Sequence, residues 1–428
     1  MKTIRACLLS AAACGCLCSF ANPVVTVDRV QQRYPWNGLV DIDYTIANFT
    51  GDEVDYQLAV DLVMTGATQR VYSFANYAPC DAPITNGTHR LTWNAPADGV
   101  ERLERNASII IRLVYAPTTE RDADYLIIDV SGGTSAETYP VKFVKGGVPR
   151  QFNSVRYQSD RIVLKRVPAG SFWMGQGSKV NGNFTGNVSS PTSSRHYVTL
   201  TKDFFLGLFP VTQRQHELVM GSPCGGNAGV CSRGGTKPTY DWSWNTIMGA
   251  ISGGGFFTNL CAKTVCRGLP IRGFTLPTEA QREYACRAGT TNSYVYASDS
   301  TDLLDYYAYH TGNMENWSKI PSGTYYYPLA TAGSFLPNAW GFYGMQALVS
   351  EWCSDWYGEY PTSTEEEPDI DPTGPATGTQ KVLRGGNCYS TSRAIQVNSG
   401  TRLANTPQSE CDNGRHAVYG FRIMKYVP

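Results

Sequence analysis

Apolar and polar residues alternate with a period of two in short stretches between Asn22 and Val144, and this alternation stops at Lys145–Pro149. The clearest stretch is Leu39–Ile46, and turn-forming sequences such as Thr85–Thr88 separate neighbouring stretches. Because successive side chains of a strand point to opposite faces of a sheet, the pattern predicts strands with one buried face. The other predicted strands are Val24–Val27, Tyr56–Val63, Arg90–Trp93, Ser108–Val114, Tyr125–Val130 and Val141–Val144.

This number of short strands in about 120 residues is typical of an immunoglobulin-like or fibronectin-like β-sandwich. We assign that sandwich to residues 22–147 and expect it to be a scaffold, with a binding or spacing role as the alternative. Gly and Pro gather at its end, so residues 148–160 are predicted to be a linker.

Residues 161–428 follow a different pattern, rich in aromatic residues and glycine and poor in long helical stretches. We therefore predict a loop-rich α+β domain after a mainly β one. Two helices are expected, at Thr212–Met220 and Thr278–Ala288, each with a threonine that can cap its first turn. Gly289 is expected to end the second helix.

The first residues predict export. Met1–Ala21 has a short positive start, an apolar stretch and small residues at its end, as a signal peptide does. The mature chain is then secreted, periplasmic or on the cell surface, and the cysteines near the end of this segment leave a lipid anchor open. We find no other long apolar run, so no transmembrane span is expected. The chain has 36 Lys and Arg residues and 36 Asp and Glu residues, which argues against a nucleic-acid partner.

Nine cysteines follow the predicted signal peptide, and an oxidising compartment favours disulfides between near pairs. The disulfide candidates are Cys224, Cys231, Cys261 and Cys266. Cys388 with Cys411 is a weaker candidate pair, and Cys286 and Cys353 lie in apolar surroundings typical of buried packing residues. Because no CxxC pair occurs after the signal peptide, a zinc site is not predicted.

Seven short motifs occur in order between Arg161 and Lys425. They are Val167–Gly175, Phe204–Gln213, Leu276–Arg287, Pro337–Met345, Ser350–Tyr357, Leu383–Gly386 and Gly420–Arg422. With these motifs the second half resembles the formylglycine-generating enzyme family, also called the sulfatase-modifying factor domain, a variant of the C-type-lectin-like fold. Arginines within and between the motifs can bind carboxylates by forked hydrogen bonds and so connect loops. We expect such pairs between Arg384, Arg402 or Arg422 and Glu279, Glu351 or Asp355.

The resemblance implies a copper(I) site made by two cysteines shortly after the Arg-Gly-Gly turn. Oxidases of the family use oxygen there to convert a substrate cysteine into formylglycine. In this chain Ser390 and Ile395 occupy the two positions. A hydroxyl and an alkyl group cannot replace the two soft thiolates that copper(I) prefers, so we expect no copper oxidase activity. Cys388 together with Cys411 is the remaining route to such a site.

The resemblance also implies one structural calcium ion, held by a loop just before the Glu-Trp motif. The matching ligands would be the carbonyls of Gly344, Ala347 and Val349 and the carboxylate of Glu351. Oxygen ligands in a bent loop suit calcium. The alternative is an ion pair between Glu351 and an arginine, and the sequence leaves both open.

Together these observations predict an exported, noncatalytic domain that binds an unknown polypeptide or small ligand in the family's groove. The expected groove residues are Trp340, Asn387, Tyr389, Ser390, Arg393 and Arg402, with the loop 313–327 over them. Aromatic and arginine side chains concentrate binding energy well. The alternative is an oxidoreductase of the sulfatase-maturation type acting on exported polypeptides. The acidic run Thr364–Asp371 is expected to be a solvated loop.

Overall fold

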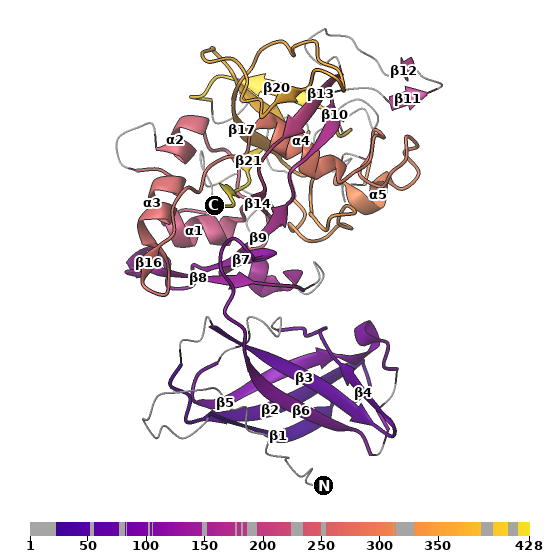
Figure 1. The fold of residues 1–428 in the computed structure, drawn as a ribbon, viewed down its shortest axis with the longest axis vertical. Coiled ribbons are helices and arrows are strands. Elements are labelled where there is room, and N and C mark those ends of the chain that lie inside the picture. The colour runs from indigo at the N-terminus through magenta and orange to yellow at the C-terminus, as the bar shows by residue number, and fades with distance from the viewer. Residues whose placement is uncertain are drawn as a thin grey trace, which may run out of the picture. The chain divides into compact units, whose positions relative to one another are not determined.

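A computed structural model of the chain divides into two compact units, which are described separately (Figure 1). One comprises residues 1–122 with 143–156, and the other residues 123–142 with 157–428. The structure describes residues 23–51, 55–76, 82, 84–101, 103–104, 106–147, 152–175, 178–180, 183–185, 195–223, 234–249, 254–310, 312–313, 329–386, 397–409 and 418–428. The predicted signal peptide lies outside them.

The first unit is the predicted β-sandwich, made of two antiparallel three-stranded sheets that share one core. One sheet has the order β1-β2-β5 and the other β4-β3-β6. Every second residue of β2, from Val40 to Ile46, is buried in that core, as the alternation predicts. The strands are β1 (Val24–Gln32), β2 (Leu39–Ala47), β3 (Tyr56–Met64), β4 (Ala67–Arg70), β5 (Gly87–Asn94) and β6 (Ser108–Tyr115), and a short 3-10 helix, η3, covers Ala95–Asp98.

A seven-stranded sheet in the second unit has the order β16-β15-β8-β7-β9-β14-β22. Its strands are β7 (Tyr125–Asp129), β8 (Tyr139–Val144), β9 (Arg161–Val167), β14 (Phe204–Gly207), β15 (Thr264–Cys266), β16 (Leu269–Pro270) and β22 (Met424–Tyr426), with the 3-10 helix η4 (Gly133–Ser135) between β7 and β8. The sequence analysis gave the strands now labelled β7 and β8 to the sandwich. The assignment of residues 22–147 to the sandwich therefore needs correction at residues 123–142. They belong to the second unit, where β7 pairs with β9 along its whole length.

The predicted linker at residues 148–160 also needs correction where the structure describes it. Residues 155–158 form the 3-10 helix η6 (Val155–Gln158), and Tyr157 is fully buried. The Gln215 side chain donates to the Tyr157 carbonyl at 3.1 Å, and Thr212 donates to the Gln158 carbonyl at 2.8 Å. This part of the chain is therefore bound to the second unit and does not act as a free spacer.

Both predicted helices are present, and each begins with the expected threonine cap. Thr212 caps α1 (Gln213–Met220) and Thr278 caps α4 (Glu279–Arg287), and each forms a capping box with the glutamine three residues later. The left-handed residue that ends α4 is Ala288, one position before the predicted Gly289. Three further helices are α2 (Trp244–Met248), α3 (Phe256–Lys263) and α5 (Leu304–Tyr307).

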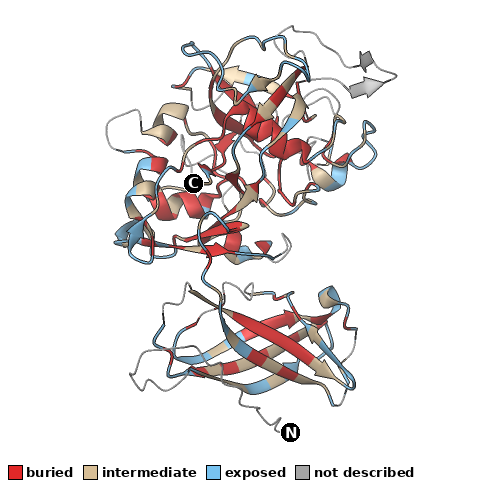
Figure 2. Ribbon diagram, in the orientation of Figure 1, coloured by how far each residue is buried: buried red, intermediate tan, exposed pale blue. Residues whose placement is uncertain are grey.

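Three smaller sheets complete the second unit. Their orders are β10-β13-β18, β20-β19-β17-β21 and the pair β11-β12. These strands are β10 (Gly170–Met174), β11 (Ser178–Val180), β12 (Asn183–Thr185), β13 (His196–Leu200), β17 (Ser350–Trp356), β18 (Asp369–Ile370), β19 (Lys381–Arg384), β20 (Arg402–Asn405) and β21 (Tyr419–Phe421). Helix α4 contacts β10, β17 and β19, so it lies at the centre of this part of the molecule (Figures 1 and 2).

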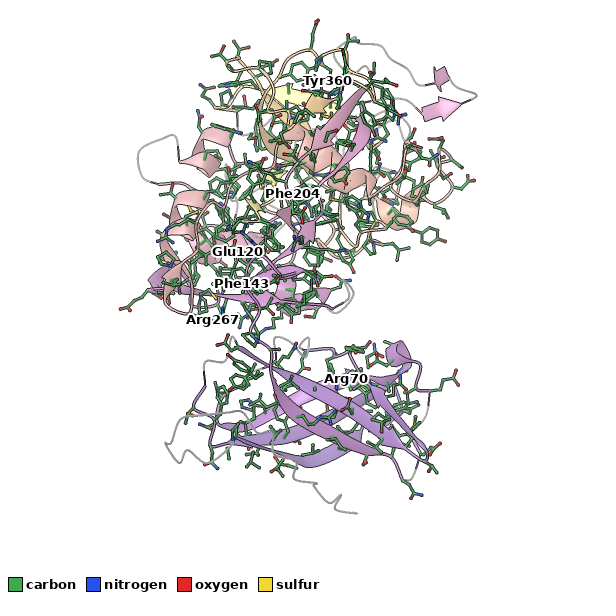
Figure 3. All side chains as sticks on the ribbon, viewed as in Figure 1. Arg70, Glu120, Phe143, Phe204, Arg267 and Tyr360 are labelled. Carbon is green, nitrogen blue, oxygen red and sulfur yellow. The ribbon has the colours of Figure 1, made fainter. Side chains whose placement is uncertain are left out.

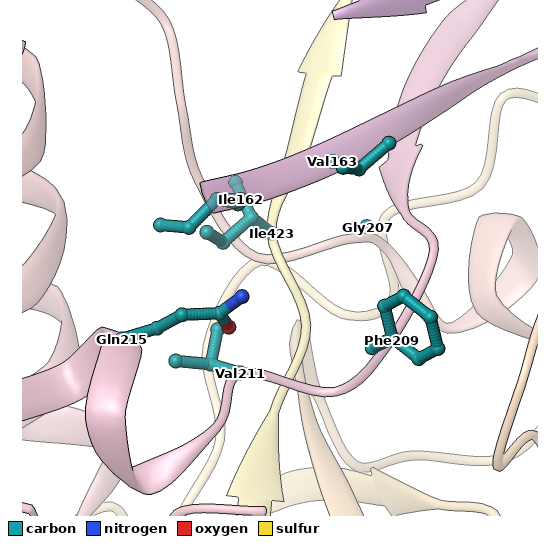
Figure 4. Close-up of a pocket in the computed structure, with 7 residues that line it drawn as sticks. All are labelled: Ile162, Val163, Gly207, Phe209, Val211, Gln215 and Ile423. Atoms are coloured by element: carbon teal, nitrogen blue, oxygen red, sulfur yellow. The ribbon is translucent and has the colours of Figure 1, made fainter. Parts of the chain in front are cut away.

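The core between the seven-stranded sheet and α1 is closely packed. Its cavity has a volume of about 10 Å³, room for roughly one water molecule (Figure 4). The residues around it are Ile162, Val163, Gly207, Phe209, Val211, Gln215 and Ile423. Among the described residues, no helix has the length and apolar character needed to cross a membrane.

Candidate functional site

Helix α4 carries four charged side chains into the interior of the second unit. All nine residues of the helix are buried, and its charged members are Glu279, Arg282, Glu283 and Arg287 (Figure 2). Burial of a charge is costly unless the charge is paired and hydrogen-bonded, so the partners of these side chains decide what the site can do.

Glu351 of β17 is the centre of the first group of buried ion pairs. Arg282 Nε donates to Glu351 Oε2 at 2.7 Å, and Arg422 donates from Nε and Nη2 to the two carboxylate oxygens at 3.1 and 3.0 Å. The three side chains are at most 1% exposed. Burial alone would raise the pKa of Glu351, but the two guanidinium groups outweigh it and lower that pKa below its ordinary value.

A second group of ion pairs surrounds Glu283. Its Oε1 accepts from Arg287 Nε at 2.7 Å and from the Gly175 amide at 2.9 Å, and its Oε2 accepts from Arg384. Arg384 also donates to the carbonyls of Gly400 and Thr401. The expected ion pairs are thus confirmed between Arg422 and Glu351 and between Arg402 and Glu279. Arg384 binds mainly Glu283, and its Nε lies 3.7 Å from Glu279.

Two backbone groups of the loop expected to hold calcium are engaged within the protein. Arg282 Nη2 donates to the Met345 carbonyl at 2.9 Å, and the Ala347 amide donates to the Gly385 carbonyl at 2.7 Å. The Glu351 carboxylate, the charged ligand that calcium would need, faces two guanidinium groups. A divalent cation beside these positive charges would be repelled, so Gly344, Ala347, Val349 and Glu351 as arranged here do not fit calcium. The described residues also contain no cluster of three His, Cys, Asp or Glu side chains able to share a metal ion.

Two of the six predicted groove residues are described, and they contact different parts of α4. Trp340 packs edge-on against Tyr284 with ring centroids 5.0 Å apart. Arg402 binds Glu279, in the first turn of the helix, through two hydrogen bonds of 2.7 and 2.8 Å. The other predicted members, Asn387, Tyr389, Ser390 and Arg393, and most of the loop 313–327, lie outside the described residues.

A pocket with a volume of about 510 Å³ opens beside the first turn of α4. It includes Arg402 but not Trp340. Its charged and polar lining, apart from Arg402, comes from β13, α4, β17, β18 and the loops around them, namely His196, Glu279, Asp355, Glu359, Tyr360, Asp369, Asp371 and Thr373. The sequence did not indicate this pocket. The acidic run Thr364–Asp371 was expected to be a solvated loop, but its residues Asp369 and Ile370 form β18 and pair with β13.

Asp355 is the most perturbed carboxylate of this pocket. It is 3% exposed, and its Oδ2 accepts from the Glu279 amide at 2.9 Å and from the Ser354 hydroxyl at 3.0 Å. Burial and the negative charge of Glu279 raise the pKa of Asp355 to about 7. Lys381 of β19, Arg402 of β20 and Tyr360 are the other charged or titratable groups that interact with it or with Glu279 nearby.

The cysteines give a mixed result. Cys261 and Cys266 do not form the disulfide suggested by their spacing. Cys261 belongs to α3, whereas Cys266 pairs opposite Leu269 in the hairpin that follows the helix. Cys286 and Cys353 are free and buried, as predicted. Cys224, Cys231, Cys388 and Cys411 lie outside the described residues.

The fold and these contacts define a loop-rich domain in which buried arginine–carboxylate pairs hold a short central helix to the surrounding strands. The family model of the sulfatase-modifying factor enzyme 1-like domain matches residues 154–427, so the chain belongs to this family. The resemblance stated from the motifs is thereby confirmed.

Curated relatives agree with this assignment. The chain is 34% identical over 145 residues to the formylglycine-generating enzyme of Streptomyces coelicolor, and 33% identical over 167 residues to that of Thermomonospora curvata. These stretches cover 33% and 35% of this chain and 45% and 48% of the relatives, so about half of each enzyme is matched. It is also 32% identical over 156 residues to the serine/threonine-protein kinase pkn1 of Chlamydia pneumoniae, covering 36% of this chain and 21% of the kinase.

Proposed function

We propose that this protein is an exported, noncatalytic binding module built on the sulfatase-modifying factor scaffold. The observation that carries the proposal is the sequence after Gly386. The resemblance to the family's oxidases puts their copper-binding cysteines where Ser390 and Ile395 stand. Copper(I) needs soft ligands, which a hydroxyl and an alkyl group do not provide.

The contacts before and after this segment support the proposal. The Gly385 carbonyl accepts a hydrogen bond from the Ala347 amide. The φ angle of Gly385 is +93°, in the left-handed region that glycine adopts without strain. Val397, on the far side of the segment, is fully buried. The residues on both sides of the segment 387–396 are thus held in the fold, which supports a binding role for a scaffold whose two copper positions, by the resemblance, carry no cysteine.

The second candidate is an oxidoreductase of the sulfatase-maturation type. The similarity to two formylglycine-generating enzymes favours it. In this case Cys388 and Cys411 would have to supply the thiolates, because the chain has no other cysteine after Cys353.

Copper(I) titration of the purified, reduced protein against a chromogenic copper(I) chelator separates the two candidates. We expect the wild-type protein to bind no stoichiometric copper(I). When it is incubated in air with a cysteine-containing peptide, the cysteine should keep its sulfur and remain unchanged. The double variant Ser390→Cys/Ile395→Cys is the matched positive control, and it should gain copper(I) binding. One bound copper(I) in the wild type, lost in Cys388→Ser, would establish the oxidoreductase instead.

A further inference from the structure

The pocket beside the first turn of α4 has the size and charge of a ligand site that the copper segment does not explain. Its volume of about 510 Å³ lies within the usual range of roughly 300–1,000 Å³ for small-molecule sites. Five carboxylates and one arginine line it. The acids are Glu279, Asp355, Glu359, Asp369 and Asp371.

The single lining arginine, Arg402, has its positive charge engaged within the protein. It forms a fork with both oxygens of Glu279 and donates to the Gly358 carbonyl at 2.6 Å. Its guanidinium carbon lies 4.2 Å from the ring centres of both Tyr357 and Tyr360 (Tyr360 is labelled in Figure 3). Glu279 and Arg402 therefore neutralise each other, and the remaining carboxylates make the pocket negative.

Two of the remaining carboxylates have oxygens open to a ligand. Asp355 is 3% exposed, yet only its Oδ2 accepts hydrogen bonds from the described residues. A Cβ placed on Gly374, another residue of the pocket wall, would lie 3.6 Å from Asp355 Oδ1, so this oxygen lies next to that wall. The Asp369 carboxylate accepts no hydrogen bond from the described part of the chain, and the imidazole of His196 has its Nε2 3.9 Å from Asp369 Oδ2. Asp371 differs, because Thr201 donates to it from both amide and hydroxyl.

The distribution of these groups selects the kind of cation. No three acidic, histidine or cysteine side chains of the described residues meet closely enough to share a metal ion, so a compact divalent cation does not match. The carboxylates are spread along a wall that also contains apolar side chains, which suits separated charges joined by an alkyl chain. The apolar members are Met174, Ala280, Pro361, Ile370, Pro372 and Pro375.

We propose that this pocket binds an aliphatic amine with more than one ammonium group, whose charges pair with the open oxygens of Asp355 and Asp369. The alkyl chain between the ammonium groups contacts Met174 and Ile370. Such a ligand is either a free polyamine or neighbouring lysine side chains of a polypeptide. The proposal deepens the binding role proposed above, but it depends on different residues, and the copper titration does not bear on it.

Isothermal titration calorimetry of the full chain tests the proposal with two probes, spermidine and the dipeptide amide acetyl-Lys-Lys-NH2. We expect saturable binding of at least one probe, and the stronger binder identifies the source of the ammonium groups. Asp355→Asn and Asp369→Asn should each weaken that binding at least tenfold. Glu366→Gln is the matched control, because it removes an exposed carboxylate near the pocket but outside its lining, and it should change the affinity less than twofold.

The variant Glu359→Gln tests binding at a position where the substitution should not affect folding. Glu359 lines the pocket and is exposed, so its replacement should weaken binding without changing the melting temperature. Absence of saturable binding by both probes overturns the proposal. Equal affinities of the wild type and the folded Asp355→Asn and Asp369→Asn variants overturn it as well. The proposal also fails if magnesium, at the same ionic strength, competes for the pocket as well as the amine probes do.

Discussion

Glu351→Gln is the change that most directly tests how the second unit is held together. Glu351 balances Arg282 and Arg422, and all three side chains are at most 1% exposed. Glutamine keeps the shape of glutamate and can still accept from one guanidinium. Its amide group then points a donor at the other guanidinium, and two buried positive charges lose their counter-ion.

The cost can be worked from this geometry. Removing one partner of a buried ion pair destabilises a protein by about 3–5 kcal/mol. In a domain of this size, 1 kcal/mol shifts the melting temperature by roughly 2 °C, so the transition of the second unit should fall by about 6–10 °C. Differential scanning calorimetry at one scan rate measures this shift.

Glu217→Gln is the matched control. Glu217 pairs with Arg214 at 2.6 Å on the surface of α1, where the two side chains are 41% and 46% exposed. Exposed pairs of this kind contribute less than about 1 kcal/mol, so the melting temperature should change by roughly 2 °C at most. If the two variants melt at the same temperature, Glu351 is not the counter-ion that holds the unit together.

The same measurement addresses calcium. We expect the wild-type transition to be the same with calcium and with a chelator, because the Glu351 carboxylate already binds two arginines. A calcium-dependent rise in the wild type that disappears in Glu351→Gln would show that the carboxylate binds calcium after all.

Three further predictions concern stability in the second unit. Thr278→Ala removes the hydroxyl that accepts from the Gln281 amide, one of the two hydrogen bonds of the α4 capping box, and should cost about 1 kcal/mol in urea denaturation. Between pH 5 and pH 7, the Asp355→Asn variant should lose less stability than the wild type does. The folded-state pKa of about 7 lies above the ordinary value of 3.8, so wild-type Asp355 loses stability as pH rises between them. His216→Phe should make the protein less sensitive to acid between pH 6.5 and 4. Burial lowers the pKa of His216 to about 4, so the wild type loses stability as pH falls through this window.

Local patterns predicted the strands well but not always their partners. The alternation in β2 is repeated in its burial, and both capped helices begin where the threonines place them. β7 shows where this reasoning fails. Its residues Tyr125, Leu126, Ile127 and Ile128 are all buried, as expected for a strand covered on both faces. The sandwich strand β3 also has a continuous buried run, from Leu58 to Leu62, so local burial alone could not have separated β7 from the sandwich.

The candidate site was less accessible to sequence reasoning, because its contacts join distant parts of the chain. Glu351 meets Arg282 and Arg422, which are 69 and 71 residues away, and the motifs alone could not choose between these arginines and calcium. The pocket likewise combines residues from β10 to β20. Its carboxylates come from three separate segments, Glu279 from one, Asp355 and Glu359 from the second, and Asp369 and Asp371 from the third. Composition predicts that arginines pair with carboxylates, but not which ones meet.

The arginines around α4 also show how the loops of the second unit are held in place. Five buried arginines face three glutamates in these pairs, and the excess donors bind backbone carbonyls of the surrounding loops. Those carbonyls belong to Gly175, Gly207, Asn292, Tyr343, Met345, Gly358, Ser399, Gly400 and Thr401. A carbonyl accepts a hydrogen bond whatever side chain its residue carries. The loops are thus fixed through their backbone, by contacts that do not depend on which side chains the loop residues carry.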